Sequence, residues 1–266
     1  MSGFAWADFA TGLGWAAAAA FAVMLVTFAV AVRKGVHRIV DVAWGLGFAA
    51  VAVVGFLVSA GTGDPGRRVL VTVLTVMWGL RLAVHIARRG RGHGEDPRYE
   101  RMLSQAPGNR NLYALRMVYL LQGALVWLVS LPVQAAQYVT GPTTGFAWAG
   151  TLLWAVGMFF EAVGDAQLAR FKADPAAKGR IMDRGLWRYT RHPNYFGDFC
   201  VWWGLFLIVC DSLGAAAVCV VSPLVMSLLL TKGSGKRLLE RHMAERPGYA
   251  GYAARTSGFF PLPPRR

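Results

Sequence analysis

The sequence predicts an all-α, polytopic membrane protein, and two observations carry that prediction. The chain of 266 residues is 55% hydrophobic and only 16% charged, with a mean hydropathy of +0.41, whereas soluble domains carry about 25% charged residues. Uncharged tracts also recur along the chain at the length of about 20 residues that a helix needs to cross a bilayer. These two features exclude a disordered chain, a collagen-like chain and most soluble enzymes.

The apolar tracts predict about seven transmembrane helices within a single integral membrane domain, residues 1–266. Four of the tracts contain no charged residue, and the others carry one or two ionisable side chains each. In chain order the predicted spans are 12–32, 42–60, 69–87, 117–138, 146–164, 193–210 and 212–230. The chain has no internal repeat and no low-complexity linker that would divide it further.

The basic residues predict how these helices are oriented. The 28 Lys and Arg residues against 14 Asp and Glu give a net charge of +14, which fits either a nucleic-acid-binding protein or a membrane protein with basic loops. All of them except Arg67 and Arg68 fall in the segments 33–38, 81–116, 170–191 and 232–266. The positive-inside rule then places the N-terminus outside and the C-terminus in the cytoplasm. We therefore expect no nucleic acid as a partner.

The N-terminal region predicts no cleaved signal peptide, and the cysteines predict no metal site. No Lys or Arg precedes Arg33, so the basic region of a cleaved signal peptide is lacking and we expect the first span to be retained. Cys200, Cys210 and Cys219 lie in apolar tracts without a C-x-x-C pair. We expect them to be buried thiols and not disulfides or metal ligands.

Ionisable side chains inside the predicted spans are the first candidates for chemistry, because such groups are costly in a bilayer. Arg81 and His85 stand four residues apart and share one helical face, as do Glu161 and Asp165, and Asp41 opens the second span. They either pair with one another to hold helices together or line a functional cavity. All of them crowd toward the predicted cytoplasmic half.

The segment 161–198 is the second candidate region. It reads EAVGDAQLARFKADPAAKGRIMDRGLWRYTRHPNYFGD, so Arg and Lys alternate with acidic and aromatic residues. Basic residues there could simply attract anionic lipid headgroups. Arg also pairs with phosphate through two hydrogen bonds, Lys adds a point charge, and Tyr and Trp offer faces for stacking. This mixture suits a nucleotide cofactor better than a lipid surface, although the chain has no glycine-rich signature of soluble nucleotide-binding folds.

Several sequence blocks carry a resemblance to a known family. In chain order the blocks are DVAWGLGF at Asp41, WGLRLAVHI at Trp78, EDPRY at Glu95, RHPNYFGD at Arg191, which is the most specific, and RPGYAGYAARTSGFFP at Arg246. In this order they resemble the steroid 5-alpha-reductase superfamily of integral membrane proteins, and most closely its bacterial branch of uncharacterised, DUF1295-type, reductase-like proteins. They cover most of the chain from Asp41 onward. The resemblance implies a protein of the bacterial inner membrane.

The resemblance implies an enzyme that binds NADPH on the cytoplasmic side and reduces a C=C bond conjugated to a carbonyl in a lipophilic substrate. Carried over by position, the cofactor contacts are Asp165, Lys172, Arg191, His192, Asn194, Tyr195, Asp198 and Tyr252. The steroid reductases polarise the carbonyl with a Glu in the second span and a Tyr in the third. Here those spans offer Asp41, Arg81 and His85. We expect Arg81 or His85, oriented by Asp41, to stabilise the enolate, with Tyr119 a poorer candidate.

Two other functions stay open. The R-H-P-x-Y element is also similar to membrane isoprenylcysteine and phospholipid methyltransferases, which use S-adenosylmethionine. Those enzymes usually carry a pair of acidic residues after the last span, where this chain has Glu240 alone beside Leu239. A non-enzymatic lipid-binding or transport protein is the third possibility. Of the broken helices and repeats typical of transporters, the chain offers only Pro132 and Pro223, which can kink spans.

Overall fold

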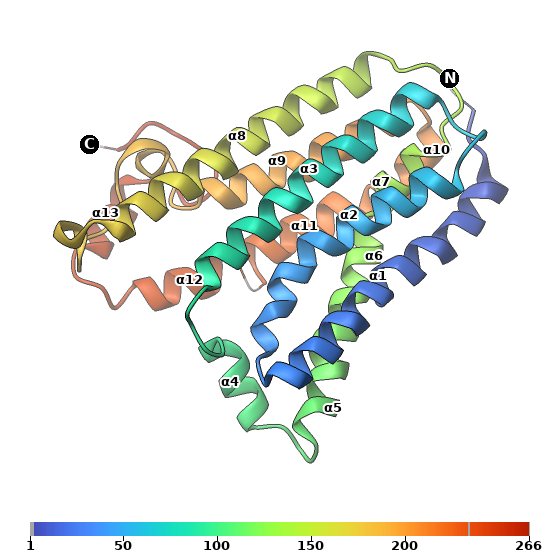
Figure 1. Ribbon diagram of the computed structural model, residues 1–266. Helices are drawn as coiled ribbons and strands as arrows, with labels where there is room; N and C mark the ends of the chain where they lie inside the picture. Colours follow the sequence, from blue (N-terminus) through green and yellow to red (C-terminus); the bar gives the residue numbers. More distant parts are fainter. Residues whose placement is uncertain (1–2, 234, 266) are drawn as a thin grey trace. The chain divides into compact units, whose positions relative to one another are not determined.

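The protein is built of helices joined by loops, as predicted. The computed structural model describes residues 3–233 and 235–265, and Figure 1 shows long helices joined by short loops and short helices. Within these residues the only β-type pairing is two isolated bridges, between Phe4 and Val139 and between Thr190 and Ser257. The prediction of an all-α fold is confirmed.

The chain forms two compact units, and each unit consists of two segments that are separated in the sequence. Unit 1 consists of Met1–Ala147 and Ile208–Cys219, and unit 2 of Trp148–Leu207 and Val220–Arg266. The elements of unit 1 are α1 (Trp6–Lys34), η1 (His37–Ile39), α2 (Val40–Val58), α3 (Pro65–Gly90), α4 (Pro97–Ser104), α5 (Arg110–Ala114), the π-helical η2 (Leu115–Leu120), α6 (Leu121–Val129), α7 (Leu131–Ala136) and α10 (Leu213–Cys219). Unit 2 holds most of α8 (Gly145–Ala173), then η3 (Pro175–Ala177), η4 (Gly185–Arg188), α9 (Pro193–Leu207), α11 (Val221–Thr231), α12 (Lys236–Met243) and α13 (Tyr249–Arg255). The prediction of one domain over residues 1–266 stays a prediction.

Six helices in the described part of the chain are long and apolar enough to cross a membrane, so the protein is an integral membrane protein. They are Trp6–Lys34, His37–Val58, Pro65–Gly90, Arg110–Val129, Gly145–Ala173 and Leu213–Thr231. The remaining predicted span, 193–210, corresponds to α9, which has 15 residues. At about 1.5 Å per residue, a helix of that length does not cover a hydrocarbon core of about 30 Å. Seven crossings and the orientation of the chain stay predictions.

Two prolines interrupt helices where the sequence suggested kinks. The helix that ends at Val129 resumes at Leu131 with Pro132 in its first turn. The helix that begins at Val221 likewise carries Pro223 in its first turn. Proline lacks an N–H and is tolerated in the first turn of a helix, where that donor is not needed.

Within each unit, neighbouring helices cross at glycines. A Cβ added at Gly45 of α2 would lie 2.3 Å from the carbonyl oxygen of Gly79 in α3. In unit 2, a Cβ at Gly157 of α8 would lie 2.5 Å from the carbonyl oxygen of Gly197 in α9. Small residues at such crossings let helix backbones approach closely, as is common in membrane proteins. The crossing of α8 and α9 places the predicted cofactor segment next to the end of α8.

Candidate functional site

Unit 2 contains a cavity of about 630 Å³, a size typical of small-molecule sites. Its walls come from the end of α8, the loop that follows α8, and the helices α12 and α13. The basic side chains in its lining are Lys172, Lys178, Arg180, Arg191 and Arg246, accompanied by His192 and His242. Asp174 is the one carboxylate among the described lining residues. The cavity is therefore strongly cationic.

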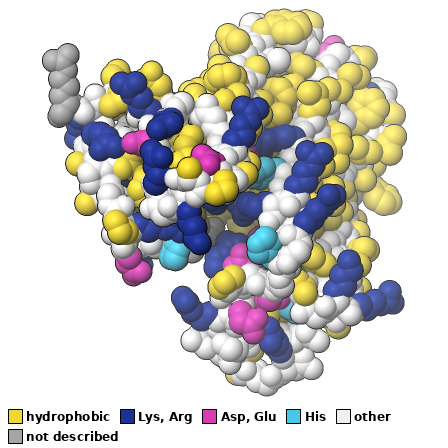
Figure 2. Space-filling model, turned by 60° about the vertical axis from the view of Figure 1, so that its left-hand side comes forward, with side chains coloured by type: hydrophobic (Ala, Val, Ile, Leu, Met, Phe, Trp, Pro, Cys, Tyr) yellow, Lys and Arg dark blue, Asp and Glu magenta, His cyan; other side chains and the backbone are white. Residues whose placement is uncertain are grey.

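The remaining wall of this cavity is apolar and aromatic. Its aliphatic and aromatic side chains include Leu168, Phe171, Ile181, Met182, Leu239, Met243, Trp187, Tyr249 and Tyr252. Cations beside aromatic faces suit a ligand that carries both phosphate and an aromatic ring. In Figure 2, Lys and Arg side chains gather on the face turned toward the reader, so basic groups are also accessible outside the cavity.

One hydrogen bond within the loop and two to α8 hold the loop that forms one wall. The carboxylate of Asp174 accepts from the backbone N–H of Ala176 at 2.9 Å and caps η3. The side-chain oxygen of Gln167 accepts from the N–H of Leu186 at 2.9 Å. The indole N–H of Trp187 donates to the carbonyl oxygen of Gly164 at 3.0 Å. These anchors place the basic residues 178–191 around a fixed wall.

Arg191, His192 and Glu240 form a cluster at the edge of the cavity. Glu240 of α12 accepts from Nε of Arg191 at 2.9 Å and lies 2.8 Å from its Nη2. His192 Nε2 lies 3.2 Å from the same carboxylate. Burial lowers the pKa of His192 to about 4, although the hydrogen bond and charge of Glu240 oppose the shift. His192 is therefore neutral at pH 7, and in that state its Nε2–H donates to Glu240.

Most N–H groups of the Arg191 guanidinium already have partners within the protein. Its Nη1 donates to the carbonyl oxygens of Ala253 at 2.7 Å and Thr256 at 3.0 Å, while Nε and Nη2 face Glu240. Arg191 thus joins the loop to α12 and α13 and shapes the cavity that it lines. Pairing of Arg191 with a cofactor phosphate stays a prediction.

Other basic residues are better placed to receive an anion. Within the described part of the chain, Lys178, Arg180 and Arg246 line the cavity without an ion-pair partner. A cation that lacks a protein partner keeps its full charge available to a ligand. Lys178 and Arg180 belong to the segment that the sequence singled out, whereas Arg246 comes from the tail.

Two predicted tyrosines have defined contacts in unit 2. The hydroxyl of Tyr252, on α13, donates to the carbonyl oxygen of Trp187 at 2.6 Å, and burial raises the pKa of this tyrosine. Tyr252 therefore lines the cavity and holds its wall in place. The ring of Tyr195 stacks on His192 with centroids 5.3 Å apart and planes at 6°.

The other predicted cofactor residues lie nearby but outside the described lining of this cavity. The side-chain amide of Asn194 donates to Asp165 at 3.4 Å, which joins the start of α9 to α8. Asp198 and Tyr195 lie on α9. The structure thus brings Lys172, Arg191, His192 and Tyr252 around one cavity, and it places the remaining predicted residues on α8 and α9.

The predicted catalytic residues all belong to unit 1. Asp41 accepts from the hydroxyl of Tyr99 at 2.6 Å and from Arg98 at 3.0 Å, so α4 closes over the start of α2. Burial and the charge of Asp41 raise the pKa of Tyr99, which keeps it protonated as a donor. Arg81 and His85 are half-buried on α3. The role of Asp41, Arg81 and His85 in catalysis stays a prediction.

Sequence reasoning named Tyr119 as a poorer catalytic candidate but did not predict the cluster in unit 1 to which it belongs. Glu95 accepts from the backbone N–H groups of His37 at 2.6 Å and Arg38 at 2.8 Å, and so caps η1. The buried His37 ring lies 3.1 Å from the hydroxyl of Tyr119. Tyr119 lies in the π-helical segment η2, a geometry that often occurs at functional sites. Glu95 opens the EDPRY block, but residue types alone do not show that its carboxylate reaches the start of η1.

Among the comparisons with known proteins, one family model matches the chain. A family model described as "Protein of unknown function (DUF1295)" matches residues 27–256. No curated protein matches the chain. No solved structure matches it either.

Proposed function

The chain belongs to the DUF1295 family of proteins of unknown function, and on this premise we propose that it is an NADPH-dependent membrane reductase related to the steroid 5-alpha-reductase superfamily. It acts on a C=C bond conjugated to a carbonyl in a lipophilic, steroid-like or other lipid substrate. The observation that carries the proposal is the cationic, partly aromatic cavity of unit 2.

The charge of the cavity discriminates between the candidate cofactors. NADPH carries a pyrophosphate and a 2′-phosphate, whereas S-adenosylmethionine carries a sulfonium cation. Five Lys and Arg residues against one Asp line the cavity, so it attracts a polyanion and repels a cation. This favours the reductase over the methyltransferase.

Each part of the cavity has a role in the proposed binding. Lys172, Lys178, Arg180 and Arg246 would hold the phosphates. Trp187 and Tyr249 contribute aromatic rings to the lining, and a nucleotide base would stack against one of them. When bound, NADPH supplies the hydride for the reduction.

The protein must also stabilise the enolate that develops on the substrate and return a proton to it. We assign the first task to Arg81 or His85, oriented by Asp41, because a positioned cation or donor lowers the energy of developing negative charge. The predicted orientation places the cavity on the cytoplasmic side, and the predicted location is a bacterial inner membrane.

The test is binding of the two cofactors to the purified protein in lipid nanodiscs. NADPH binding is followed by energy transfer from tryptophan to the nicotinamide, and S-adenosylmethionine binding by calorimetry. We expect NADPH to bind and S-adenosylmethionine not to bind. Binding of S-adenosylmethionine alone would establish the methyltransferase instead, and binding of neither would favour a non-enzymatic lipid-binding or transport protein.

A variant pair localises the site. Lys178→Gln/Arg246→Gln removes two cations of the cavity and should weaken NADPH binding about 100-fold, since a charge-assisted hydrogen bond contributes about 1.5–3 kcal/mol. The control Arg33→Gln/Arg89→Gln removes the same charge from exposed positions of unit 1. Equal loss in both variants would show a general charge effect and no site in this cavity.

A further inference from the structure

A second hollow in unit 2, of about 600 Å³, is lined by residues that the proposed cofactor site does not use. Its lining consists of Asp183, Arg184, Gly185, Arg188, Arg255, Thr256, Pro264 and Arg265. Four of these residues are arginines and one is a carboxylate. The hollow is formed by the loop around η4 and by the tail, and none of its lining residues lines the cationic cavity.

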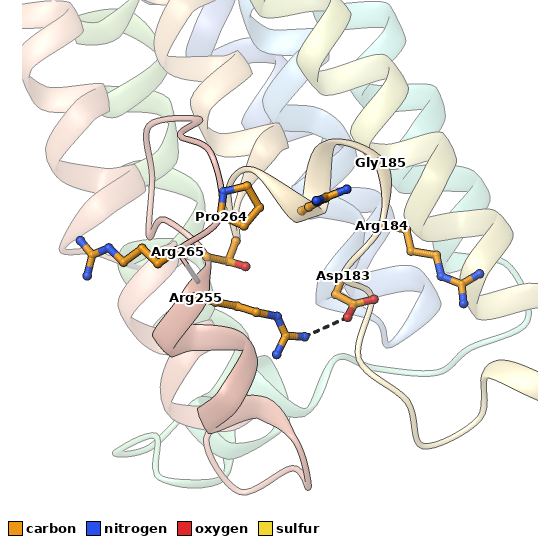
Figure 3. Close-up of a pocket in the computed structure, with 8 residues that line it drawn as sticks. Asp183, Arg184, Gly185, Arg255, Pro264 and Arg265 are labelled. Atoms are coloured by element: carbon orange, nitrogen blue, oxygen red, sulfur yellow. Dashed lines mark hydrogen bonds and ion pairs between the residues drawn. The ribbon is translucent and has the colours of Figure 1, made fainter.

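The four arginines that line this hollow are exposed at the protein surface. Arg255 pairs with Asp183 at 3.0 Å. Arg184 and Arg188 are exposed and have no ion-pair partner among the described residues. In Figure 3, Arg184 and Arg265 extend away from one another on opposite sides, whereas Arg255 points toward Asp183. Such a geometry does not enclose one anion, but it can contact several phosphates at a surface.

Exposed apolar side chains lie in the same two segments. Tyr189 is 43% exposed, and Phe260 and Leu262 are each 54% exposed. Two hydrogen bonds fix the tail in place, from the hydroxyl of Thr190 to the carbonyl of Phe259 at 2.8 Å and from the N–H of Leu262 to the carbonyl of Tyr189 at 3.0 Å. The apolar side chains are therefore presented on an ordered scaffold.

The tail packs against the apolar helix α9. Phe260 contacts Phe196 and Phe199 of α9, with ring centroids 6.0 and 5.7 Å apart. Phe199 lies about 9 Å along α9 from the start of the helix at Pro193. Phe260 therefore lies beside the apolar part of α9, while Arg184 and Arg188 belong to the loop that precedes the helix. Aromatic side chains next to cations are typical of membrane–water interfaces.

We propose that Arg184, Arg188 and Arg265, together with Tyr189, Phe260 and Leu262, form a tail patch that binds the headgroups of anionic phospholipids. The arginines contact the lipid phosphates, and the apolar side chains enter the adjoining acyl region. The patch holds the loop around η4 and the tail against the membrane. This binding does not depend on the proposed reductase activity.

The experiment compares retention of anionic lipid by the intact protein. Native mass spectrometry follows how many phosphatidylglycerol molecules stay bound after release from nanodiscs that mix phosphatidylglycerol with phosphatidylcholine. Each cation near an anionic surface contributes about fivefold in affinity. Arg184→Gln/Arg188→Gln should therefore weaken phosphatidylglycerol retention by about tenfold or more, whereas the control Arg33→Gln/Arg89→Gln, which removes the same charge without exposed apolar side chains of the patch beside it, should weaken retention clearly less.

Two further arms separate a lipid patch from a plain phosphate site. Leu262→Ser keeps every charge, and it should also weaken lipid retention, because the exposed Leu262 would no longer enter the acyl region. Inorganic phosphate at millimolar concentration should not displace the lipid. Unchanged retention in Arg184→Gln/Arg188→Gln, equal loss in the control, or full displacement by phosphate would each overturn the proposal.

Discussion

Two arginines, one in each unit, make nearly the same set of contacts in very different surroundings. Arg67 of unit 1 pairs with Asp211 at 2.7 Å and donates to the carbonyl oxygens of Gly141 and Pro142. Arg191 of unit 2 pairs with Glu240 at 2.8 Å and donates to the carbonyls of Ala253 and Thr256. Each guanidinium thus ties together segments that are far apart in the sequence.

The two pairs differ in burial and in what lies beside them. The side chains of Arg67 and Asp211 are 0% and 4% exposed, whereas those of Arg191 and Glu240 are 15% and 25% exposed. Arg67 lines none of the described pockets, but Arg191 lines the cationic cavity and adjoins the neutral His192. The same arrangement of contacts is therefore fully buried in unit 1 and forms an accessible wall of the cationic cavity in unit 2.

The largest effect is expected where the pair is fully buried. Arg67→Met leaves the carboxylate of Asp211 buried without its cation, which costs about 3–5 kcal/mol of unfolding free energy. Arg191→Met should cost about 1–3 kcal/mol, because water can reach Glu240. Unfolding by sodium dodecyl sulfate in mixed micelles, followed by tryptophan fluorescence, measures both.

Removal of both charges tests this explanation. Arg67→Met/Asp211→Leu should recover part of the stability lost in Arg67→Met, since no uncompensated charge remains. If Arg191→Met is as destabilising as Arg67→Met, burial is not what separates the two pairs.

Acid should act on the unit 2 cluster through His192. Its pKa of about 4 in the folded protein lies below the ordinary value of 6.5, so the unfolded chain binds more protons between these values. Stability is then complete above about pH 6.5 and falls as the pH drops toward about 4, by up to about 3 kcal/mol. His192→Gln, which can still donate to Glu240 but does not titrate, should lose less stability over this range. Equal losses would show that the acid sensitivity arises elsewhere.

The helices were predictable because each membrane span is a local property of about 20 residues. The end of α9 was not predictable. The predicted span ran to Cys210, but the helix stops at Leu207, directly before Ile208, whose carbonyl accepts from Arg67. That contact joins residues 141 positions apart, and no local pattern contains it.

The cavity was predictable in part for the same reason. Lys172, Arg191 and His192 lie within one basic and aromatic segment, and they do reach one cavity. Glu240 stands where the membrane methyltransferases usually carry a pair of acidic residues. In the structure it accepts a hydrogen bond from Arg191, which lies 49 positions away in the sequence. Its role depends on the packing of α12 against the loop, which residue types alone do not specify.

Substitutions at the glycine crossings should have smaller effects on stability. They allow a comparison because helices approach closely at glycines in both units. Gly79→Ala in unit 1 and Gly197→Ala in unit 2 would each place a Cβ within 2.5 Å of a facing carbonyl oxygen. Each should lose about 1–3 kcal/mol of stability. Gly14→Ala, where nothing lies within 4 Å, should gain up to about 1 kcal/mol. Of the three, only Gly197→Ala should also weaken NADPH binding, since α9 follows the cavity loop.

The smallest effects should come from two tyrosine hydroxyls, one in each unit. Tyr252→Phe removes the 2.6 Å hydrogen bond to the carbonyl of Trp187, and Tyr99→Phe removes the 2.6 Å bond to Asp41. Each should cost about 1 kcal/mol of stability, and Asp41 keeps Arg98 as a partner. NADPH affinity should fall a few-fold in Tyr252→Phe, because Trp187 then loses an anchor at the cavity wall, and stay unchanged in Tyr99→Phe. A loss of affinity in both variants, measured by the same energy-transfer titration, would mean that NADPH binding also depends on unit 1.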